Sequence, residues 1–205
     1  GELQGDQVVV EVAGCGLCHT DITFFEGVQT KKPAPIILGH EISGTVVATT
    51  EASRHLHRKQ VIVPAVLPCG ECELCRAGRE NICQHQKMPG NDFDGGFASH
   101  VVVPGRFLCV LPSDLGSFRL ADLGVVADAI TTPYQSLKRS QLKAGELAIV
   151  VGVGGVGIYM VQHAKNVGAH VVAIDVDEKR LAVATAQGAD DTLCTKGLDQ
   201  KTVKA

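Results

Sequence analysis

The chain has 205 residues, of which 45% are hydrophobic and 20% are charged, and its 22 acidic and 19 basic residues leave a formal net charge of −3. These proportions are typical of a globular protein and exclude a disordered or collagen-like chain, while the weak net charge gives no basic footprint for nucleic acid or anionic lipid. The apolar runs are far shorter than the roughly 20 residues that cross a membrane. We therefore expect the partners to be small molecules or other protein chains, with no nucleic acid and no membrane.

The first 120 residues contain short apolar runs that Gly and Pro residues separate. Each run is rich in β-branched residues and has the length of a strand, and the runs fall at residues 8–12, 42–48, 61–66, 101–103 and 108–111. This pattern predicts a β-rich domain over residues 1–120.

The pattern changes after about residue 120. Residues 120–140 carry apolar side chains at helical spacing, and Pro133 is expected to divide them into two helices. Strands then alternate with helices, at residues 148–151, 156–166, 171–174, 178–187 and 191–194. This alternation predicts a parallel α/β sheet, so we assign residues 121–205 to linker helices and the start of a second domain.

Four of the eight cysteines form a compact motif. Cys69, Cys72, Cys75 and Cys83 follow the spacing C-x2-C-x2-C-x7-C, so four thiolates on one short loop can meet at the corners of a tetrahedron. Such a closed set leaves no position for water, which predicts a structural zinc site. Two local disulfides are the alternative for the same residues.

A cysteine and a histidine elsewhere in the first domain suggest a second metal site. Cys18 supplies a thiolate and His40 an imidazole, and one further protein ligand would leave a fourth position open for water or substrate. Either residue alone is more often packed in a core, and we assign that packing role to Cys15, Cys109 and Cys194.

A glycine-rich loop follows the predicted strand at residues 148–151. Asp175 ends the next strand, at roughly the 20-residue distance where a carboxylate binds the adenosine ribose hydroxyls. Because a carboxylate there repels a 2′-phosphate, NAD is favoured over NADP. The loop glycines let a turn close and the backbone approach a pyrophosphate, and they are Gly152, Gly154, Gly155 and Gly157.

Taken in order, Cys18-His-Thr-Asp, Gly39-His-Glu, the four-cysteine motif and the glycine loop resemble the zinc-containing medium-chain alcohol dehydrogenases over nearly the whole chain. The resemblance implies a GroES-like catalytic domain followed by a Rossmann domain, a catalytic and a structural zinc, and oxidation of a secondary alcohol to a ketone with NAD. It also implies that Asp128 is the third catalytic ligand beside Cys18 and His40. Without the resemblance, Asp128 is interpreted as a residue that caps a helix.

The same resemblance implies roles for residues around that catalytic site. Glu41 is similar to a carboxylate behind the zinc that can become an exchangeable ligand, and Asp21 to a carboxylate that orients the ligand histidine. Thr20 matches the hydroxyl that binds the substrate alcohol and carries its proton away, and His19 matches a contact to the cofactor pyrophosphate. Thr20 and Asp21 also fit an ordinary cap after a strand. Thr23 stands where many relatives have the histidine that ends the proton relay, so the final proton acceptor is not assigned.

Residues 64–111 resemble a branch of the family that oxidises alicyclic hydroxyacyl-CoA thioesters in anaerobic aromatic degradation, which implies such a thioester as the substrate. Another zinc alcohol or polyol dehydrogenase, and a zinc-free reductase or ligand-binding relative, are the alternatives. Since 48 residues follow Gly157, we expect the chain to be part of a longer parent and to bind zinc without turning over substrate alone. We expect that parent to be a homo-oligomer, a dimer or a tetramer. The first residues lack the charged start and apolar stretch of a signal peptide, which favours a cytoplasmic location.

Overall fold

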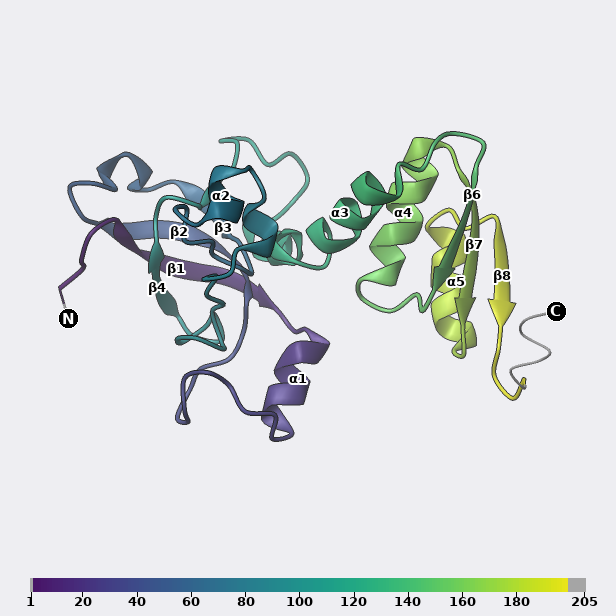
Figure 1. The fold of residues 1–205 in the computed structure, drawn as a ribbon, viewed down its shortest axis with the longest axis horizontal. Coiled ribbons are helices and arrows are strands. Elements are labelled where there is room, and N and C mark those ends of the chain that lie inside the picture. Colours follow the sequence, from purple (N-terminus) through teal and green to yellow (C-terminus); the bar gives the residue numbers. More distant parts are fainter. Residues whose placement is uncertain (1, 199–205) are drawn as a thin grey trace. The chain divides into compact units, whose positions relative to one another are not determined.

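The computed structural model describes residues 2–198 of the chain (Figure 1). Contacts between residues divide it into two compact units, one ending at Asp128 and the other beginning at Ala129. The division falls after the predicted boundary at residue 120, so that Asp128 belongs to the first unit. Among the described residues, none of the helices is long and apolar enough to cross a membrane.

The first unit is built on a five-stranded antiparallel sheet with the strand order β4-β1-β2-β3-β5. Alternate side chains of a strand face opposite sides, so in β4 Val101 and Val103 are buried in the core whereas Val102 is exposed. The predicted β-rich domain is therefore confirmed. The elements are β1 (Gln7–Gly16), α1 (His19–Phe25), β2 (Glu41–Thr49), β3 (Gln60–Val63), α2 (Glu73–Arg76), β4 (His100–Pro104) and β5 (Cys109–Val110), with 3₁₀ helices η1 (Arg54–Leu56), η2 (Glu80–Ile82) and η3 (Leu120–Ala127).

The ladder between β1 and β2 contains two irregularities in register. Val47 is an extra residue on β2 opposite Val9 and Val10, and Ala13 is an extra residue on β1 between Val12 and Gly14. After these two shifts, Gly16 lies directly opposite Glu41 at the end of the ladder. The chain then turns into α1, a helix that the sequence pattern did not predict, and the Asp21 side chain accepts a hydrogen bond from the N–H of Cys18 at its start.

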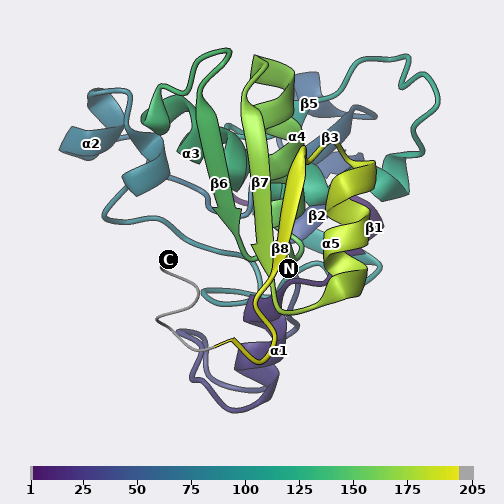
Figure 2. The same cartoon turned by 90° about the vertical axis from the view of Figure 1, so that its right-hand side faces the viewer.

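The second unit has a three-stranded parallel sheet with the order β6-β7-β8 (Figure 2). Helices α4 and α5 pack on one face of it, where Val161 and Leu181 join the alanines and valines of the strands in one core. On β6, by contrast, Leu147, Ile149 and Val151 are exposed. The predicted parallel α/β sheet is confirmed, with α3 (Thr131–Ser140), β6 (Leu147–Val151), α4 (Gly157–Val167), β7 (His170–Asp175), α5 (Glu178–Ala186) and β8 (Asp191–Cys194).

The helical segment of residues 120–140 breaks at a different place from the one predicted. Its two parts, η3 and α3, are separated around Asp128, whose φ of −140° and ψ of −64° are not helical. Pro133 lies buried in the first turn of α3. A residue without an N–H is tolerated there because the first N–H groups of a helix have no acceptor within the helix. The prediction that Pro133 divides the segment is therefore wrong.

Candidate functional site

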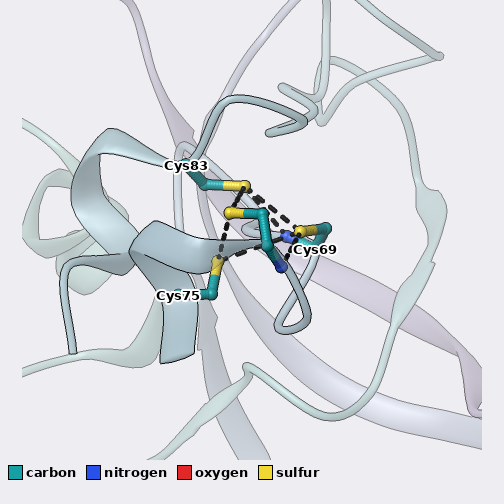
Figure 3. A group of neighbouring side chains, drawn as sticks. Cys69, Cys75 and Cys83 are labelled. Atoms are coloured by element: carbon teal, nitrogen blue, oxygen red, sulfur yellow. Dashed lines mark hydrogen bonds between the residues drawn. The ribbon is translucent and has the colours of Figure 1, made fainter. Parts of the chain in front are cut away.

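The cysteine lobe (residues 69–83) brings four sulfur atoms together, and Figure 3 shows those of Cys69, Cys75 and Cys83 turned toward one another. The Sγ–Sγ distances are 3.5 Å for Cys72–Cys75 and Cys69–Cys83, 3.8 Å for Cys72–Cys83 and 3.9 Å for Cys69–Cys75. Four sulfurs bound to one zinc ion at about 2.3 Å would lie about 3.8 Å apart at the corners of a tetrahedron. The spacing of these side chains therefore fits a tetrahedral metal ion.

Backbone amides lower the pKa of the Cys69 and Cys72 thiols, whereas burial raises the pKa of Cys75 to about 12. The N–H groups of Cys69 and His85 donate to Cys83 Sγ, and the N–H of Cys72 donates to Cys69 Sγ, each at 3.3 Å. Hydrogen bonds from the backbone, led by the N–H of Cys75, lower the pKa of Cys72 to about 6. The thiolate is the form that binds zinc. All cysteines of the described residues are free thiols, so the structure holds neither of the two local disulfides that were the alternative.

A second group of metal-binding side chains, here called the open cluster, comes from three separate elements of the first unit. Cys18 is the N-cap of α1, Glu41 begins β2 and His40 directly precedes it, and Asp128 follows η3. One ligand atom from each residue lies within 4.8 Å of the others. A thiolate, an imidazole and carboxylates are the donors that zinc takes in sites with an open position. The folded chain therefore assembles a group that fits zinc from residues far apart in the sequence.

Asp21 connects helix α1 to the segment that carries His40. Its Oδ2 accepts a hydrogen bond from the N–H of Cys18 at 2.9 Å, and its Oδ1 accepts one from the N–H of Gly39 at 3.0 Å. The same Oδ1 lies 3.4 Å from Nδ1 of His40. The two interpretations of Asp21 are therefore compatible, because one buried carboxylate caps α1 and also faces the imidazole.

His40 is 1% exposed and lies between two carboxylates. Its Nε2 is 3.6 Å from Oδ2 of Asp128, and its Nδ1 faces Asp21. Burial alone would lower the pKa of His40, but interactions with Asp128 and Asp21 raise it to about 10. The surroundings therefore favour positive charge at this position, as a site for a cation would.

The first turns of α1 carry the other candidate residues. Thr20 Oγ1 lies 3.7 Å from Cys18 Sγ, so this hydroxyl is next to the open cluster. His19 is the exposed first residue of the helix. The hydroxyl of Thr23 donates a hydrogen bond to the carbonyl of His19 at 3.0 Å, which uses its proton within the helix.

Residues 90–97, which follow the cysteine lobe, support the segment before His40 in a way that the sequence pattern did not predict. Asp94 accepts a hydrogen bond from the N–H of Ile37 at 3.0 Å and forms an ion pair with Lys32. Three consecutive N–H groups then donate to carbonyls of that segment, at 2.7–3.0 Å: Gly95 to Ile37, Gly96 to Gly39 and Phe97 to Leu38. The chain leaving the lobe thus holds the backbone that precedes His40.

In the second unit the glycine loop joins β6 to α4. Gly152 has a φ of +82°, which L side chains rarely adopt, and a Cβ on Gly157 would lie 1.9 Å from the carbonyl oxygen of Gly152. Gly154 and Gly155 have open space beside them, apart from an Arg180 guanidinium nitrogen 3.7 Å from a Cβ built on Gly154. The turn itself therefore needs Gly152 and Gly157, whereas Gly154 and Gly155 leave the loop surface accessible to a ligand.

Asp175, at the end of β7, holds this loop in place. Its Oδ2 accepts a hydrogen bond from the N–H of Val153 at 2.8 Å, and its Oδ1 accepts one from the N–H of Asp177 at 3.0 Å. These backbone donors keep the pKa of Asp175 below its ordinary value. The sequence pattern predicted a ribose contact for Asp175 but not this support of the loop.

The three cysteines expected in the core have different surroundings. Cys109 is exposed on the edge strand β5, so its predicted packing role is wrong. Cys15 and Cys194 are partly buried, and burial raises the pKa of Cys15 to about 12.

Comparisons with known proteins agree with this fold. Residues 4–113 match the alcohol dehydrogenase GroES-like domain. An alcohol dehydrogenase of Geobacillus stearothermophilus is 34% identical over 207 residues, which cover 100% of this chain and 60% of that protein. The crystal structure of the alcohol dehydrogenase of the hyperthermophilic archaeon Aeropyrum pernix has a TM-score of 0.90 and 34% identity, with 99% of this chain and 61% of that chain covered.

The crystal structure of an NAD-dependent alcohol dehydrogenase has a TM-score of 0.88 and 28% identity, with 99% of this chain and 60% of that chain covered. The chain thus spans about 60% of the length of the relatives it matches. Since the family match covers more than half of the 205 residues, the chain belongs to the zinc-type medium-chain alcohol dehydrogenase family, and residues 4–113 match its GroES-like domain.

Proposed function

We propose that the intact protein containing this chain is a zinc-dependent dehydrogenase that oxidises a secondary alcohol to a ketone with NAD. The observation that carries the proposal is the convergence of Cys18, His40, Glu41 and Asp128 within 4.8 Å, beside the Thr20 hydroxyl. The names of the relatives support the class of reaction. A zinc-free reductase or ligand-binding relative is not favoured, because a protein that binds no zinc would not need both this cluster and the cysteine lobe.

The residues of the first unit would bind the two zinc ions and the substrate alcohol. Cys18, His40 and Asp128 would hold the catalytic ion, and Asp21 would fix the orientation of the His40 ring. Zinc, when bound there, supplies a Lewis acid that lowers the pKa of an oxygen bound to it. The Thr20 hydroxyl would bind the hydroxyl of the substrate and pass its proton on. Four cysteines would hold a second, structural zinc in the lobe.

The residues of the second unit would bind the cofactor. The glycines at 152, 154, 155 and 157 and the first N–H groups of α4 would receive the pyrophosphate, with His19 as a further contact, and Asp175 would accept hydrogen bonds from the adenosine ribose. Both oxygens of Asp175 already accept a backbone N–H, but a carboxylate has about four acceptor positions and can still accept from hydroxyls. NAD, when bound, accepts the hydride.

The narrower proposal concerns the substrate. Residues 64–111 resemble the 6-hydroxycyclohex-1-ene-1-carbonyl-CoA dehydrogenase of anaerobic aromatic degradation, which supports an alicyclic hydroxyacyl-CoA substrate. The relatives reported above are named alcohol dehydrogenases, and these names specify no acyl-CoA substrate. A panel of secondary alcohols, polyols and alicyclic hydroxyacyl-CoA thioesters, assayed with NAD on the intact protein, tests the proposal. A kcat/KM for the thioester no greater than that for the free alcohols would contradict it.

We further propose that the intact protein is a dimer or a tetramer in the cytoplasm, as the family resemblance implies. Light scattering coupled to gel filtration measures the number of chains, and fractionation of the native cells measures the location. A monomeric intact protein would contradict the first part, and recovery outside the cytoplasm would contradict the second.

Elemental analysis of the reduced intact protein tests the metal assignments directly. We expect two zinc ions per chain, of which mild chelation removes one, because the open cluster leaves a position for a chelator and the four-thiolate lobe does not. Loss of the first ion should abolish turnover, and added zinc should restore it. A single, tightly held zinc per chain would leave the lobe assignment intact and contradict the catalytic one.

Replacing Asp175 by alanine is expected to weaken NAD binding about tenfold or more and to reduce the preference for NAD over NADP. The change removes the charge that repels a 2′-phosphate and also leaves the N–H groups of Val153 and Asp177 without their acceptor. Asp175→Asn removes the charge but keeps one of the two acceptors, because its amide oxygen still accepts one backbone N–H whereas its NH2 group cannot accept the other. Dissociation constants for both cofactors provide the measurement, with Asp191→Ala, an exposed carboxylate on β8, as the control. Unchanged selectivity in both Asp175 variants would remove this residue from cofactor recognition.

A further inference from the structure

Gly16 lies directly opposite Glu41 in the ladder between β1 and β2. A Cβ placed on Gly16 would lie 2.1 Å from Oε2 of Glu41, and 3.1 Å and 3.2 Å from its Cβ and Cδ. Such distances are far below van der Waals contact, and the nearest atom is the carboxylate oxygen itself. The Glu41 carboxylate therefore occupies the space that any side chain at position 16 would need.

The place of that carboxylate makes this contact relevant to metal binding. Glu41 is 4% exposed, and one of its oxygens lies within 4.8 Å of the ligand atoms of Cys18, His40 and Asp128. A Cβ at position 16 would have to push this carboxylate aside, which would move it relative to the other ligand atoms. A methyl group at position 16 would therefore act on the cluster through Glu41.

The reason for glycine at position 16 is this space rather than backbone conformation. Gly16 does not have a positive φ, so its backbone conformation is one that alanine adopts without strain. Gly14, two residues earlier on β1, differs in what it faces, because a Cβ there would lie 2.1 Å from the carbonyl oxygen of Ala121. The same substitution at the two positions thus meets a movable side chain in one case and a backbone atom in the other.

We propose that Gly16 is a positioning residue for the open metal site, since its missing side chain provides the space that keeps the Glu41 carboxylate beside the ion. The inference rests on the proposed function, because it takes the open cluster to hold a metal. The bulge at Ala13 belongs to the same arrangement, since it restores the register after an earlier shift between Val9 and Val10, so that Gly16 faces Glu41. A carboxylate in that position adds negative charge beside the ion. Mutation of the groups that surround the ligands of a metal typically lowers its affinity by 10- to 100-fold.

The test compares Gly16→Ala, Glu41→Ala and the double variant in the intact protein, with Gly14→Ala as the matched control. Zinc affinity of the open cluster is measured by competition with a chelator, and Co²⁺ loaded in its place reports the coordination by its visible absorption spectrum. We expect Gly16→Ala and Glu41→Ala each to lower the affinity about tenfold and to give similar Co²⁺ spectra. In the Glu41→Ala background, Gly16→Ala should have a much smaller effect, because the carboxylate that it displaces is gone and only the 3.1 Å contact with the Cβ at position 41 remains. Gly14→Ala should lower affinity equally with and without Glu41.

Additive effects of Gly16→Ala and Glu41→Ala would overturn the proposal, and so would an unchanged affinity and spectrum in Gly16→Ala. Should Glu41→Ala fail to fold, Glu41→Ser, which also lacks the carboxylate, replaces it with the same expected coupling. If the wild-type protein binds no second metal, the proposed function fails. The contact is then tested in the metal-free protein, where Gly16→Ala should destabilise the chain with Glu41 present more than with alanine at position 41. Equal destabilisation in the two backgrounds would overturn the role of Gly16 independently.

Discussion

Replacing Cys72 by serine is expected to release one zinc ion per chain and to unfold the cysteine lobe. A structural zinc contributes its binding free energy to folding, about 10–16 kcal/mol in isolated zinc-finger peptides. Apart from the metal, few interactions stabilise the lobe. Its two helices, α2 and η2, have one turn each, and its buried residues are two of the zinc-binding cysteines, Cys75 and Cys83. Zinc content, protease cleavage within residues 69–83 and the thermal midpoint provide the measurement.

The exposed Cys109 supplies the matched control for this change. Cys109→Ser should leave zinc content, cleavage and thermal midpoint as in the wild type, because the thiol lies outside the lobe on the edge strand β5. Residues 90–97, which follow the lobe, hold the segment before His40. We therefore expect Cys72→Ser also to lower, in part, the zinc affinity of the open cluster. A variant with normal stability and lost turnover would contradict the structural assignment of the lobe.

Replacing Asp128 by alanine is expected to remove the second zinc ion and to lower kcat/KM with NAD by about 10³-fold or more, since a bound Lewis acid supplies several kcal/mol of transition-state stabilisation. The carboxylate lies 3.6 Å from Nε2 of His40 and belongs to the open cluster. The fold should persist, because the Asp128 side chain is 26% exposed and lies outside the sheet. Zinc content, thermal midpoint and steady-state kinetics of the intact protein provide the measurement.

Asp122→Ala is the control for Asp128→Ala. Asp122 lies in the preceding 3₁₀ helix η3, is 48% exposed and pairs with Arg119, so its loss should change neither metal content nor turnover. If Asp128→Ala keeps two zinc ions and normal kinetics, Asp128 is a helix-end residue and a different side chain completes the open cluster. Glu41, already within reach, is then the candidate.

The features that could be predicted from sequence are those whose physics is local. The spacing of Cys69, Cys72, Cys75 and Cys83 brings the sulfurs together within one short loop, and the structure places them 3.5–3.9 Å apart. Strands and helices alternate after residue 146. Each helix crosses over the sheet between two strands, so the strands run parallel. Both predictions depend on neighbours along the chain, so one sequence is enough.

The open cluster depends on contacts between distant residues. Cys18, His40 and Asp128 come from three elements, and their spacing along the chain does not indicate that they meet. The helix α1 that follows Cys18 was missed because it has only seven residues, and one of its hydrogen bonds to the rest of the unit, from the N–H of Gly39 to Asp21, joins distant segments. The error at Pro133 has a similar origin. The pattern of apolar residues does not show where a helix begins, so it cannot distinguish a proline in a helix interior from one in the first turn.

The sequence by itself determined the two-domain order, the four-cysteine lobe and the glycine loop before Asp175, because each is set by short-range spacing and by the periods of strand and helix. The tertiary structure decided which isolated residues form a site and what supports them. The register of β1 against β2, which shifts at two irregularities, brings Gly16 opposite Glu41, and hydrogen bonds from residues 90–97 hold the backbone before His40. Such placements follow from packing and hydrogen bonding between segments far apart in the chain, and no local pattern contains them.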